Sequence, residues 1–393
     1  VGVSLSGSYV HGREEQKMAK LTRLQRVWCW VRRILLGFLG LLVVLVLVGA
    51  GYEMLGRKNA DEKFPPRGKM VDVGGRKMHI DCRGTGSPTV VLEAGLGIGG
   101  SLDWTLVHDE IANFTRTCAY DRAGIMWSDP KETPQRAAAV ADDLHELLKG
   151  AGIDDPLVLV GHSIGGPYIR TYVGKYGNQV AGLVMVDPSH PDQVARLGKV
   201  VRVDVDPKQA STLLHTAKAL SWTGLVRFVI SRGERPTLRS AEETKKLGDA
   251  LTISAAYGSL SINGETSELD GFDRTMDDAR GVHSFGDRPL IVLTAMAPFK
   301  PEQLKELGMT VEDGLRFKQE WKALNADQAA FSTRGRQKIV PDASHYIQVD
   351  RPEVVISAVR QVVDTVRADG RATAKKSQNN GKVASPPAVD REM

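Results

Sequence analysis

The sequence lacks the side-chain patterns of the common metal and nucleotide sites. Its 393 residues contain no His-Glu-x-x-His, no Cys-x-x-Cys and no nucleotide-binding motif. The three cysteines are too few for a disulfide scaffold. We therefore expect neither a metal nor an organic cofactor. With 42% hydrophobic residues, the chain is long enough for one sizeable core, an inserted subdomain and tails.

The sequence also lacks a net positive charge outside the N-terminal segment. The first 60 residues hold nine Lys or Arg against three Glu, a net charge of +6, whereas the whole chain carries +5. The remaining body is therefore close to neutral. Nothing in it suggests a nucleic-acid surface.

One long hydrophobic run stands out, at residues 34–52, which carry no charge. As a helix rising ~1.5 Å per residue, the run comes close to the ~30 Å hydrocarbon thickness of a bilayer. Trp28, Trp30 and Tyr52 lie at its two ends, where aromatic rings favour the interface. The basic residues before it predict a single-pass anchor with the N-terminus in the cytoplasm and the large domain outside.

Two other interpretations of this run stay open. A signal peptide cleaved near Ala50 would release a secreted protein, although the run exceeds the ~7–15 apolar residues of such peptides. A buried core helix is the other. The chain begins with Val1, and its first methionine is Met18. Because the first 17 residues could precede the natural start, we expect them to have no structural role.

A short apolar run in mid-chain ends in Gly-His-Ser-Ile-Gly. The run before the serine is typical of a buried parallel strand and the run after it of a helix, so Ser163 falls on the turn between them. Gly161 and Gly165 allow a sharp turn that exposes the hydroxyl, and the amide of Ile164 would face the space in front of it. The alternative is that Ser163 only caps the helix. The strand before the Gly-x-Ser-x-Gly pattern and the helix after it favour a nucleophile.

Strand and helix patterns alternate over most of the chain, which predicts a mainly parallel sheet with helices on both faces. The alternation breaks over residues 188–286, which contain helical patterns only, at 207–220, 224–230 and 241–257. Apolar residues between 213 and 230 could line a substrate pocket, dip into a membrane or pack on the core. We expect strands at 68–73, 76–82, 88–93, 116–120, 157–160, 180–186, 289–293 and 337–340, and helices at 102–111, 133–148, 164–176, 311–324 and 352–366.

The predicted organisation is a mostly parallel α/β core interrupted by a helical cap. Its parts are a basic N-terminal segment (1–33), a transmembrane anchor (34–52), a linker (53–67), the first part of the core (68–187), the cap (188–286), the second part of the core (287–368) and a disordered tail (369–393).

Two turns that follow strands invite a chemical role. The Gly-rich turn after residue 93 lacks the Lys of a P-loop and the spacing of a dinucleotide site, so we expect its amides, that of Leu96 first, to help hold an oxyanion. A purely structural turn is the alternative. Asp121 and Arg122 on the next turn are interpreted as a structural ion pair.

A serine nucleophile needs a base and a group that orients the base. His345 follows the last predicted strand, at the sheet edge where ligands bind in open α/β folds. His162 would point to the other side of the turn, and His190 is a weaker rival. For the acid, Asp187 follows the strand after the serine turn, at the same edge; Asp192 or an acid of the cap comes next.

These motifs resemble the α/β-hydrolase fold superfamily. The likeness spans about residues 68–368 and is carried by Ala-Gly-Leu-Gly after one strand, Asp-Arg-Ala-Gly after the next, Gly-His-Ser-Ile-Gly-Gly, and Ser-His followed by Asp-Arg-Pro-Glu. It implies an eight-stranded sheet whose second strand is antiparallel and lies beside the fourth, which would make Cys82 and Cys118 neighbours. Either a disulfide or two buried thiols would fit those positions.

Two departures from the family pattern matter. Ala94 stands where many members have His in the oxyanion loop, and the usual acid position after residue 293 holds no carboxylate. Some members that resemble haloalkane dehalogenases place their acid where Asp187 lies. Those enzymes and the related epoxide hydrolases use an Asp nucleophile, so Ser163 argues against both chemistries.

The sequence therefore predicts a membrane-anchored serine hydrolase, of carboxylesterase or lipase type, that acts on a small apolar ester. Ser163, His345 and Asp187 would form the triad, with Leu96 and Ile164 as oxyanion donors. Hydrolysis of amides, peptides, lactones, thioesters or carbon–carbon bonds, and acyl transfer, use the same triad. A non-catalytic hydrolase-like binding protein is the alternative of another class, and the oligomeric state stays open.

Overall fold

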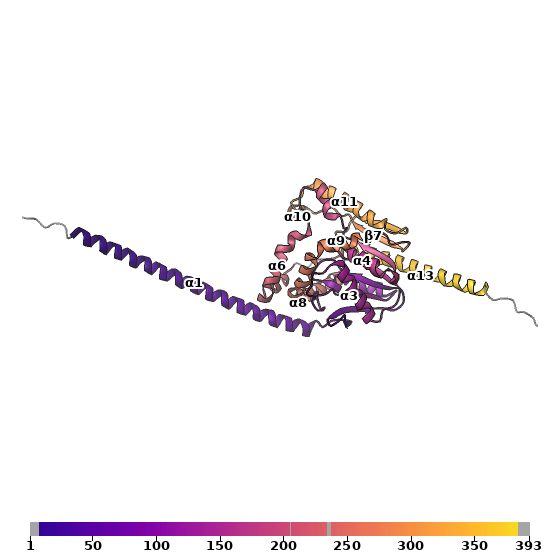
Figure 1. Ribbon diagram of the computed structural model, residues 1–393, viewed down its shortest axis with the longest axis horizontal. Coiled ribbons are helices and arrows are strands. Elements are labelled where there is room, and N and C mark those ends of the chain that lie inside the picture. The colour runs from indigo at the N-terminus through magenta and orange to yellow at the C-terminus, as the bar shows by residue number, and fades with distance from the viewer. Residues whose placement is uncertain (1–7, 205, 234–236, 384–393) are drawn as a thin grey trace, which may run out of the picture.

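A computed structural model gives the backbone of residues 8–204, 206–233 and 237–383, and the side chains of residues 22–372 within those ranges. Its centre is an eight-stranded sheet with helices on both sides (Figure 1). The strand order is β1-β2-β4-β3-β5-β6-β7-β8, and all neighbouring strands from β4 to β8 are parallel, whereas β2 is antiparallel to β1 and β4. The predicted α/β-hydrolase topology is therefore confirmed. The strands are β1 (Lys69–Asp72), β2 (Lys77–Arg83), β3 (Thr89–Glu93), β4 (Thr117–Tyr120), β5 (Leu157–His162), β6 (Val180–Val186), β7 (Leu290–Ala295) and β8 (Gly335–Val340).

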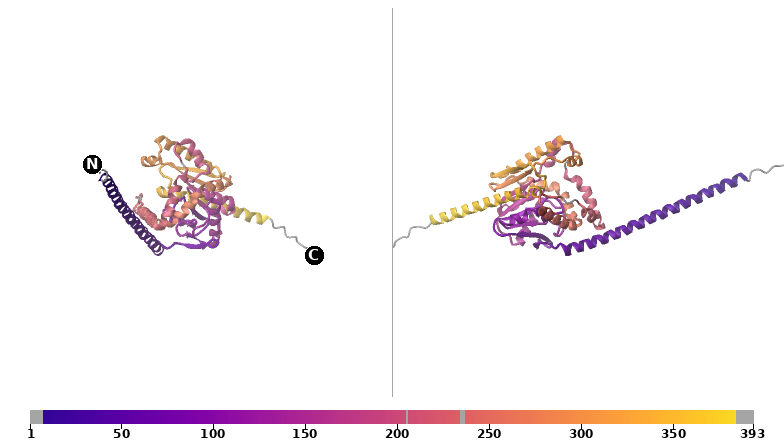
Figure 2. Two further views of the ribbon diagram at one scale, coloured as in Figure 1. Left: turned by 60° about the vertical axis from the view of Figure 1, so that its left-hand side comes forward. Right: turned by 180° about the vertical axis from the view of Figure 1, so that it is seen from behind.

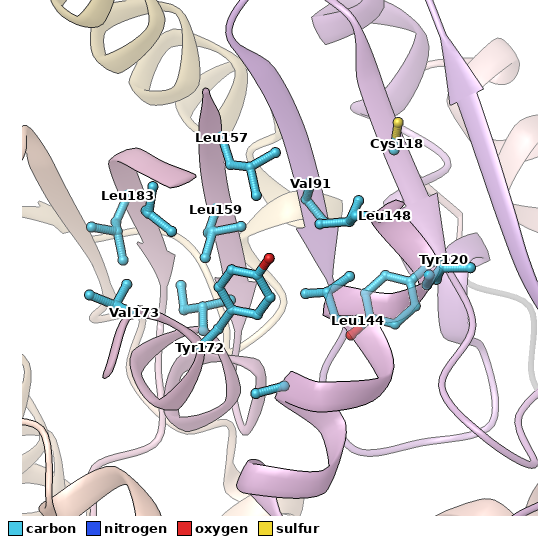
Figure 3. Packing of buried hydrophobic residues seen from close by; sticks show 14 of the residues in the cluster. Val91, Cys118, Tyr120, Leu144, Leu148, Leu157, Leu159, Tyr172, Val173 and Leu183 are labelled. Carbon is cyan, nitrogen blue, oxygen red and sulfur yellow. The ribbon is translucent and has the colours of Figure 1, made fainter. Parts of the chain in front are cut away.

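Alternation along the strands builds two cores, one on each face of the sheet. Val91 and Leu159 point to the face covered by α3 (Ala137–Gly150) and α4 (Gly165–Tyr176), as Figure 3 shows. Their neighbours in β3 and β5 point to the other face, which α2 (His108–Ala112) and α13 (Pro352–Val383) cover. β5 is buried along its whole length. Because both faces are covered, the chemistry is confined to the edge where the parallel strands end.

The two core cysteines form a disulfide. Cys82 of β2 and Cys118 of β4 are directly paired in the antiparallel register, with their Cα atoms 4.0 Å apart, and their sulfurs are bonded. The resemblance implied the neighbourhood and left the bond open; the structure has the bond.

The N-terminal helix differs from the prediction at its end. α1 (Ser8–Lys63) runs through the apolar segment and eleven residues beyond it, where a linker was expected over 53–67. The helix continues because no proline interrupts it before Pro65 and because Glu53 and Ala60 are buried against the domain. Its N-terminal part extends away from the domain, and residues 1–7 of the basic segment lie outside the described residues (Figure 2).

In the described residues between β6 and β7, all the regular elements are helices, as expected. The sequence predicts a helix only over residues 241–257, whereas α8 (Ala241–Asp270) continues for 13 more residues. Gly, Ser and Asn in this second half are weak helix formers, but their small side chains let the helix pack closely, and Gly264 lies against Gly124. We call residues 188–286 the inserted segment. Its helices are α5 (Gln193–Val200), η3 (Pro207–Ala210), α6 (Ser211–Leu220), η4 (Ser221–Thr223), α7 (Leu225–Ile230), α8 (Ala241–Asp270) and α9 (Phe272–Arg280).

The C-terminal region is more helical than predicted. α13 continues to Val383, so the disorder expected from residue 369 does not hold for 369–383, where Ala, Lys and Gln favour a helix and no proline occurs. Residues 384–393 lie outside the described residues. The other helices are η1 (Gly100–Trp104), η2 (Gly177–Gln179), α10 (Pro301–Glu306), α11 (Val311–Ala329) and α12 (Ile347–Asp350).

Candidate active site

Ser163 lies on a strained turn at the end of the central strand. β5 ends at His162 and α4 begins at Gly165, and Ser163 between them has a φ of 54°. A left-handed backbone costs a non-glycine residue about 1–3 kcal/mol and persists only where the surroundings enforce it. Here its amide donates to the carbonyl oxygen of Val186 (3.2 Å), and its carbonyl accepts from Gly166 and Ser189 (3.0 and 2.8 Å).

The two glycines that flank the serine are required by close packing. A Cβ on Gly161 would lie 2.6 Å from the carbonyl oxygen of Gly165, and one on Gly165 would lie 2.7 Å from that of Glu93. Neither distance leaves room for a methyl group. The sharp turn therefore depends on glycine for contact, while the unusual backbone angle falls on Ser163 itself.

His345 and Asp187 form a hydrogen-bonded pair in the same cavity as Ser163. Nδ1 of His345 donates to Oδ2 of Asp187 over 2.7 Å, although 158 residues separate them. All three side chains line one cavity of about 1030 Å³. Within the described residues no hydrogen bond joins the Ser163 hydroxyl to the ring; such bonds often tighten only with substrate bound.

Asp187 is held in place by two further donors. Its Oδ1 accepts from the amide of Ala295 and from Nε1 of Trp321, both at 2.8 Å. Ala295 is the last residue of β7, after which many members of the family have their acid and this chain has none. Here the end of β7 instead donates its backbone amide to the carboxylate of Asp187. Nothing in the sequence near position 187 pointed to Trp321, because it comes from α11, 134 residues further on.

The rival residues are engaged elsewhere. Asp192 accepts from Nε of Arg280 (2.8 Å), and its own amide donates to Nδ1 of His190. Burial lowers the pKa of His190 to about 4. Neither is among the residues that line the cavity of Ser163.

His162 contacts His345. The sequence predicts that the His162 side chain points to the other side of the turn from Ser163, and this contact is compatible with that direction. Burial, reinforced by the nearby His345, lowers the pKa of His162 well below its ordinary value, so the ring is neutral. Its Nε2 donates to the carbonyl oxygen of His345 (3.0 Å), and the two rings are 4.7 Å apart. This supporting contact was not predicted.

The loop after β3 is fixed by a buried arginine. Arg122 donates to the carbonyl oxygens of Ala94 and Gly95 (2.8 and 2.7 Å) and lies between the carboxylates of Glu93 and Glu268, each at 2.6 Å. Burial alone would lower its pKa, but the two carboxylates outweigh it and raise that pKa well above the ordinary value. The arginine thus holds the loop of the candidate oxyanion donor from behind.

The predicted ion pair between Asp121 and Arg122 is wrong, because each of the two residues has other partners. Asp121 bonds instead to Nδ1 of His79 (2.8 Å) and to the amide of Ser101 (2.7 Å), because neighbouring side chains on this turn point in different directions. The structural role predicted for both residues fits these contacts.

The residues of both candidate oxyanion donors line the cavity. Leu96 and Ile164 both line it, and in the part of the chain that the structure describes neither amide donates to another backbone group. In that same part no group of three His, Cys, Asp or Glu side chains could hold a metal ion. The arrangement offers a hydroxyl, an oriented imidazole and two candidate oxyanion donors.

The sequence resembles known proteins over part or most of its length. The alpha/beta hydrolase fold family matches residues 88–220. A probable transporter from Hormonema carpetanum is 34% identical over 128 residues, which are 30% of this chain and 18% of that protein. The chain spans between 18% and 49% of the length of the first four curated relatives it matches.

Two longer similarities cover most of the chain. The 2-(acetamidomethylene)succinate hydrolase of Mesorhizobium japonicum is 24% identical over 75% of this chain and 95% of its own. The solved structure of an esterase from Thermogutta terrifontis superposes with a TM-score of 0.51 at 20% identity, over 76% of this chain and 97% of that one. Together with the strand order, these findings show that the chain has the α/β-hydrolase fold.

Proposed function

We propose that the chain is a membrane-anchored serine hydrolase that cleaves carboxylic esters through an acyl-enzyme on Ser163. The observation that carries the proposal is the union of a strained Ser163 and the His345–Asp187 pair in one cavity. The fold alone supports no more than a hydrolase. The choice of serine chemistry rests on these three side chains, since the dehalogenases and epoxide hydrolases of this fold use an aspartate nucleophile.

In the proposed mechanism Oγ of Ser163 attacks the acyl carbon while its proton passes to Nε2 of His345. Asp187 fixes the ring so that Nδ1 carries a proton and Nε2 is free to accept one. The amides of Leu96 and Ile164 donate to the oxyanion. The alcohol leaves with the proton from His345, and a water deprotonated by His345 then releases the acid.

The inserted segment acts as a cap in this proposal. It contributes Leu197, Pro207, Arg239 and Phe272 to the wall of the cavity. Pocket shape decides between substrates that share one triad. We therefore assign acyl and alcohol selectivity to this segment, with residues 68–187 and 287–368 as the catalytic core.

α1 fits a membrane anchor. Its most apolar window has a mean hydropathy of 2.8 and none of it is buried in the protein. The Cys82–Cys118 disulfide favours an oxidising compartment for the catalytic domain, with the basic N-terminus in the cytoplasm. N-terminal sequencing of the membrane fraction tests this assignment: a mature chain that begins near Gly51 would show cleavage and a secreted protein.

The test of the chemistry is labelling with a fluorophosphonate. We expect the probe to modify Ser163 of the folded protein and to leave Ser163→Ala unlabelled. The wild-type protein should hydrolyse p-nitrophenyl esters of graded acyl length, and the Ser163→Ala variant should not. An unlabelled serine in folded protein would point instead to a hydrolase-like binding protein.

Amide hydrolysis is the second candidate, favoured by the similarity to a hydrolase whose substrate name contains an acetamido group. The same triad would serve. A matched p-nitrophenyl ester and p-nitroanilide with one acyl group separate the two: a higher kcat/KM for the anilide, relative to the uncatalysed rates, would replace the ester assignment.

A further inference from the structure

A second cavity adjoins the one that contains Ser163. Its volume is about 590 Å³, within the ~300–1,000 Å³ of typical small-molecule pockets. Leu96 and Tyr346 line both cavities, so the two meet beside the candidate oxyanion loop and next to His345. From there the second cavity extends to Tyr52 and Gly56 of α1. It therefore connects the candidate active site to the end of the apolar helix.

The wall of the second cavity is mostly apolar. Its charged groups are largely compensated: Arg227 donates to Glu53 (2.9 Å) and to the carbonyl oxygen of Ala256 (2.6 Å), and burial raises the pKa of Asp103 to about 7. Such a wall suits a hydrocarbon better than a polar ligand. Its apolar members include Phe64, Ile98, Ile230, Leu251 and Ala255.

Close helix contact fixes the outer end of the cavity against α1. A Cβ on Gly49 would overlap the carbonyl oxygen of Thr223, and one on Gly56 would lie 2.5 Å from Nε of Arg227. Hydrogen bonds to Glu53 from Arg227, Arg57 and Ser259 outweigh its burial and lower its pKa, so the buried contact is ionic. The outer end of the second cavity therefore lies beside the part of α1 where its apolar run ends.

An exposed apolar surface lies beside the same part of α1. Gly224 contacts the backbone of Gly49, and the residues around it on η4 and α7 expose large side chains. A contiguous group of this kind is unusual on a soluble surface and continues the lipid-facing surface of α1. This α7 patch consists of Trp222, Leu225, Phe228 and Val229, which are 54%, 51%, 47% and 61% exposed.

We propose that the second cavity binds the hydrocarbon chain of an ester-bearing bilayer amphiphile, and that the α7 patch rests on the membrane beside α1. The chain enters near Tyr52 and runs toward Leu96 and Tyr346, which brings the ester to Ser163. The inference deepens the proposed function and rests on it. It names the substrate class as membrane lipid esters, because the cavity opens where the apolar run of α1 ends.

Photo-crosslinking in vesicles tests where the chain goes. Full-length Ser163→Ala in phosphatidylcholine vesicles is irradiated with a diazirine-bearing fatty ester, and the modified peptides are mapped by mass spectrometry. We expect labels on residues 96–99, which line the second cavity. Ala255→Trp, which fills the cavity, should lower that labelling at least tenfold. Lys245→Trp on the exposed side of the same helix should change it less than twofold, with circular dichroism melts verifying each fold.

The outcomes separate the inference from the function it rests on. Labelling of residues 96–99 that is absent, or that Ala255→Trp leaves unchanged, overturns the chain site even if Ser163 reacts with fluorophosphonate. Labelling that depends on Ala255, in a protein whose serine does not react, supports the chain site and overturns the hydrolase. In the active protein we expect kcat/KM to rise about fourfold per added methylene until the cavity is full.

The α7 patch is tested by charge. Leu225→Glu with Val229→Glu should lower the ratio of vesicle-embedded to soluble ester hydrolysis at least tenfold. Leu315→Glu, at a residue 59% exposed on α11, is the matched control and should leave that ratio within twofold. Equal ratios for the two variants would show that the patch does not rest on the bilayer.

Discussion

Replacing Asp187 by Asn isolates the role of one proton. The amide oxygen of the Asn would still accept from Ala295 and Trp321, so the side chain keeps its position. Its NH2 group would then face Nδ1 of His345, where the carboxylate now accepts over 2.7 Å. Because an amide nitrogen donates, the ring must turn to the tautomer that carries its proton on Nε2. That tautomer cannot accept a proton from Ser163.

The expected loss is large and specific. A base held in the wrong tautomer typically costs a serine hydrolase about 10⁴ in kcat. At about 1.36 kcal/mol per tenfold change, that is roughly 5.4 kcal/mol of transition-state stabilisation. Since both remaining hydrogen bonds of position 187 persist, the melting temperature should move little.

The assay is hydrolysis of p-nitrophenyl butyrate, with kcat and KM measured separately. Asp192→Asn is the matched control: it removes a surface carboxylate bonded to Arg280 and should change kcat by less than about twofold. We expect the loss of Asp187→Asn to appear in kcat with KM nearly unchanged. A loss below about tenfold, or an equal loss in Asp192→Asn, would refute the assignment of the acid.

Three further predictions concern the framework of the site. Glu268→Gln leaves Arg122 with one buried carboxylate and should cost about 3–5 kcal/mol in the free energy of unfolding, measured with urea; a cost below 1 kcal/mol would contradict the buried pair. Reduction of the Cys82–Cys118 disulfide, whose sequence separation is 36, should cost about 4 kcal/mol by loop entropy, seen as a lower melting temperature in dithiothreitol. Burial and the neighbouring Glu268 raise the pKa of Glu265 to about 7, so the folded state holds that proton more tightly than the unfolded one and loses stability as the pH rises from about 4.5 to 7. Glu265→Gln should therefore be more stable than the wild type at pH 8, by up to about 3 kcal/mol, with no difference at pH 4; a gain independent of pH would argue against the shift.

The parts of the site that the sequence predicted are those that local pattern and sheet geometry determine. Ser163 follows from a strand, a Gly-x-Ser-x-Gly turn and a helix that are adjacent in the chain. His345 and Asp187 follow because the carboxyl ends of parallel strands meet at one edge, so the structure brings together residues that the order of strands already placed there. The bond between His345 and Asp187 has the geometry that the prediction required.

The parts that were missed depend on contacts between distant segments. Trp321 reaches Asp187 across 134 residues and Glu268 reaches Arg122 across 146, and neither pairing has a local signal. The last turns of α8 were missed for the same reason, since packing of Gly264 on Gly124 overrides weak helix propensity. The sequence predicts a linker at the end of α1 because its charged residues give no sign of the buried partner Arg227.

The bond between Arg122 and Glu268 ties α8 to the edge of the sheet. If α8 lifted away from the sheet, it would break both hydrogen bonds between Arg122 and Glu268, which are 2.6 and 2.8 Å long. In the proposed mechanism these two bonds hold α8 in place, so we expect substrate to reach Ser163 around a stationary α8 and not beneath a hinged cover.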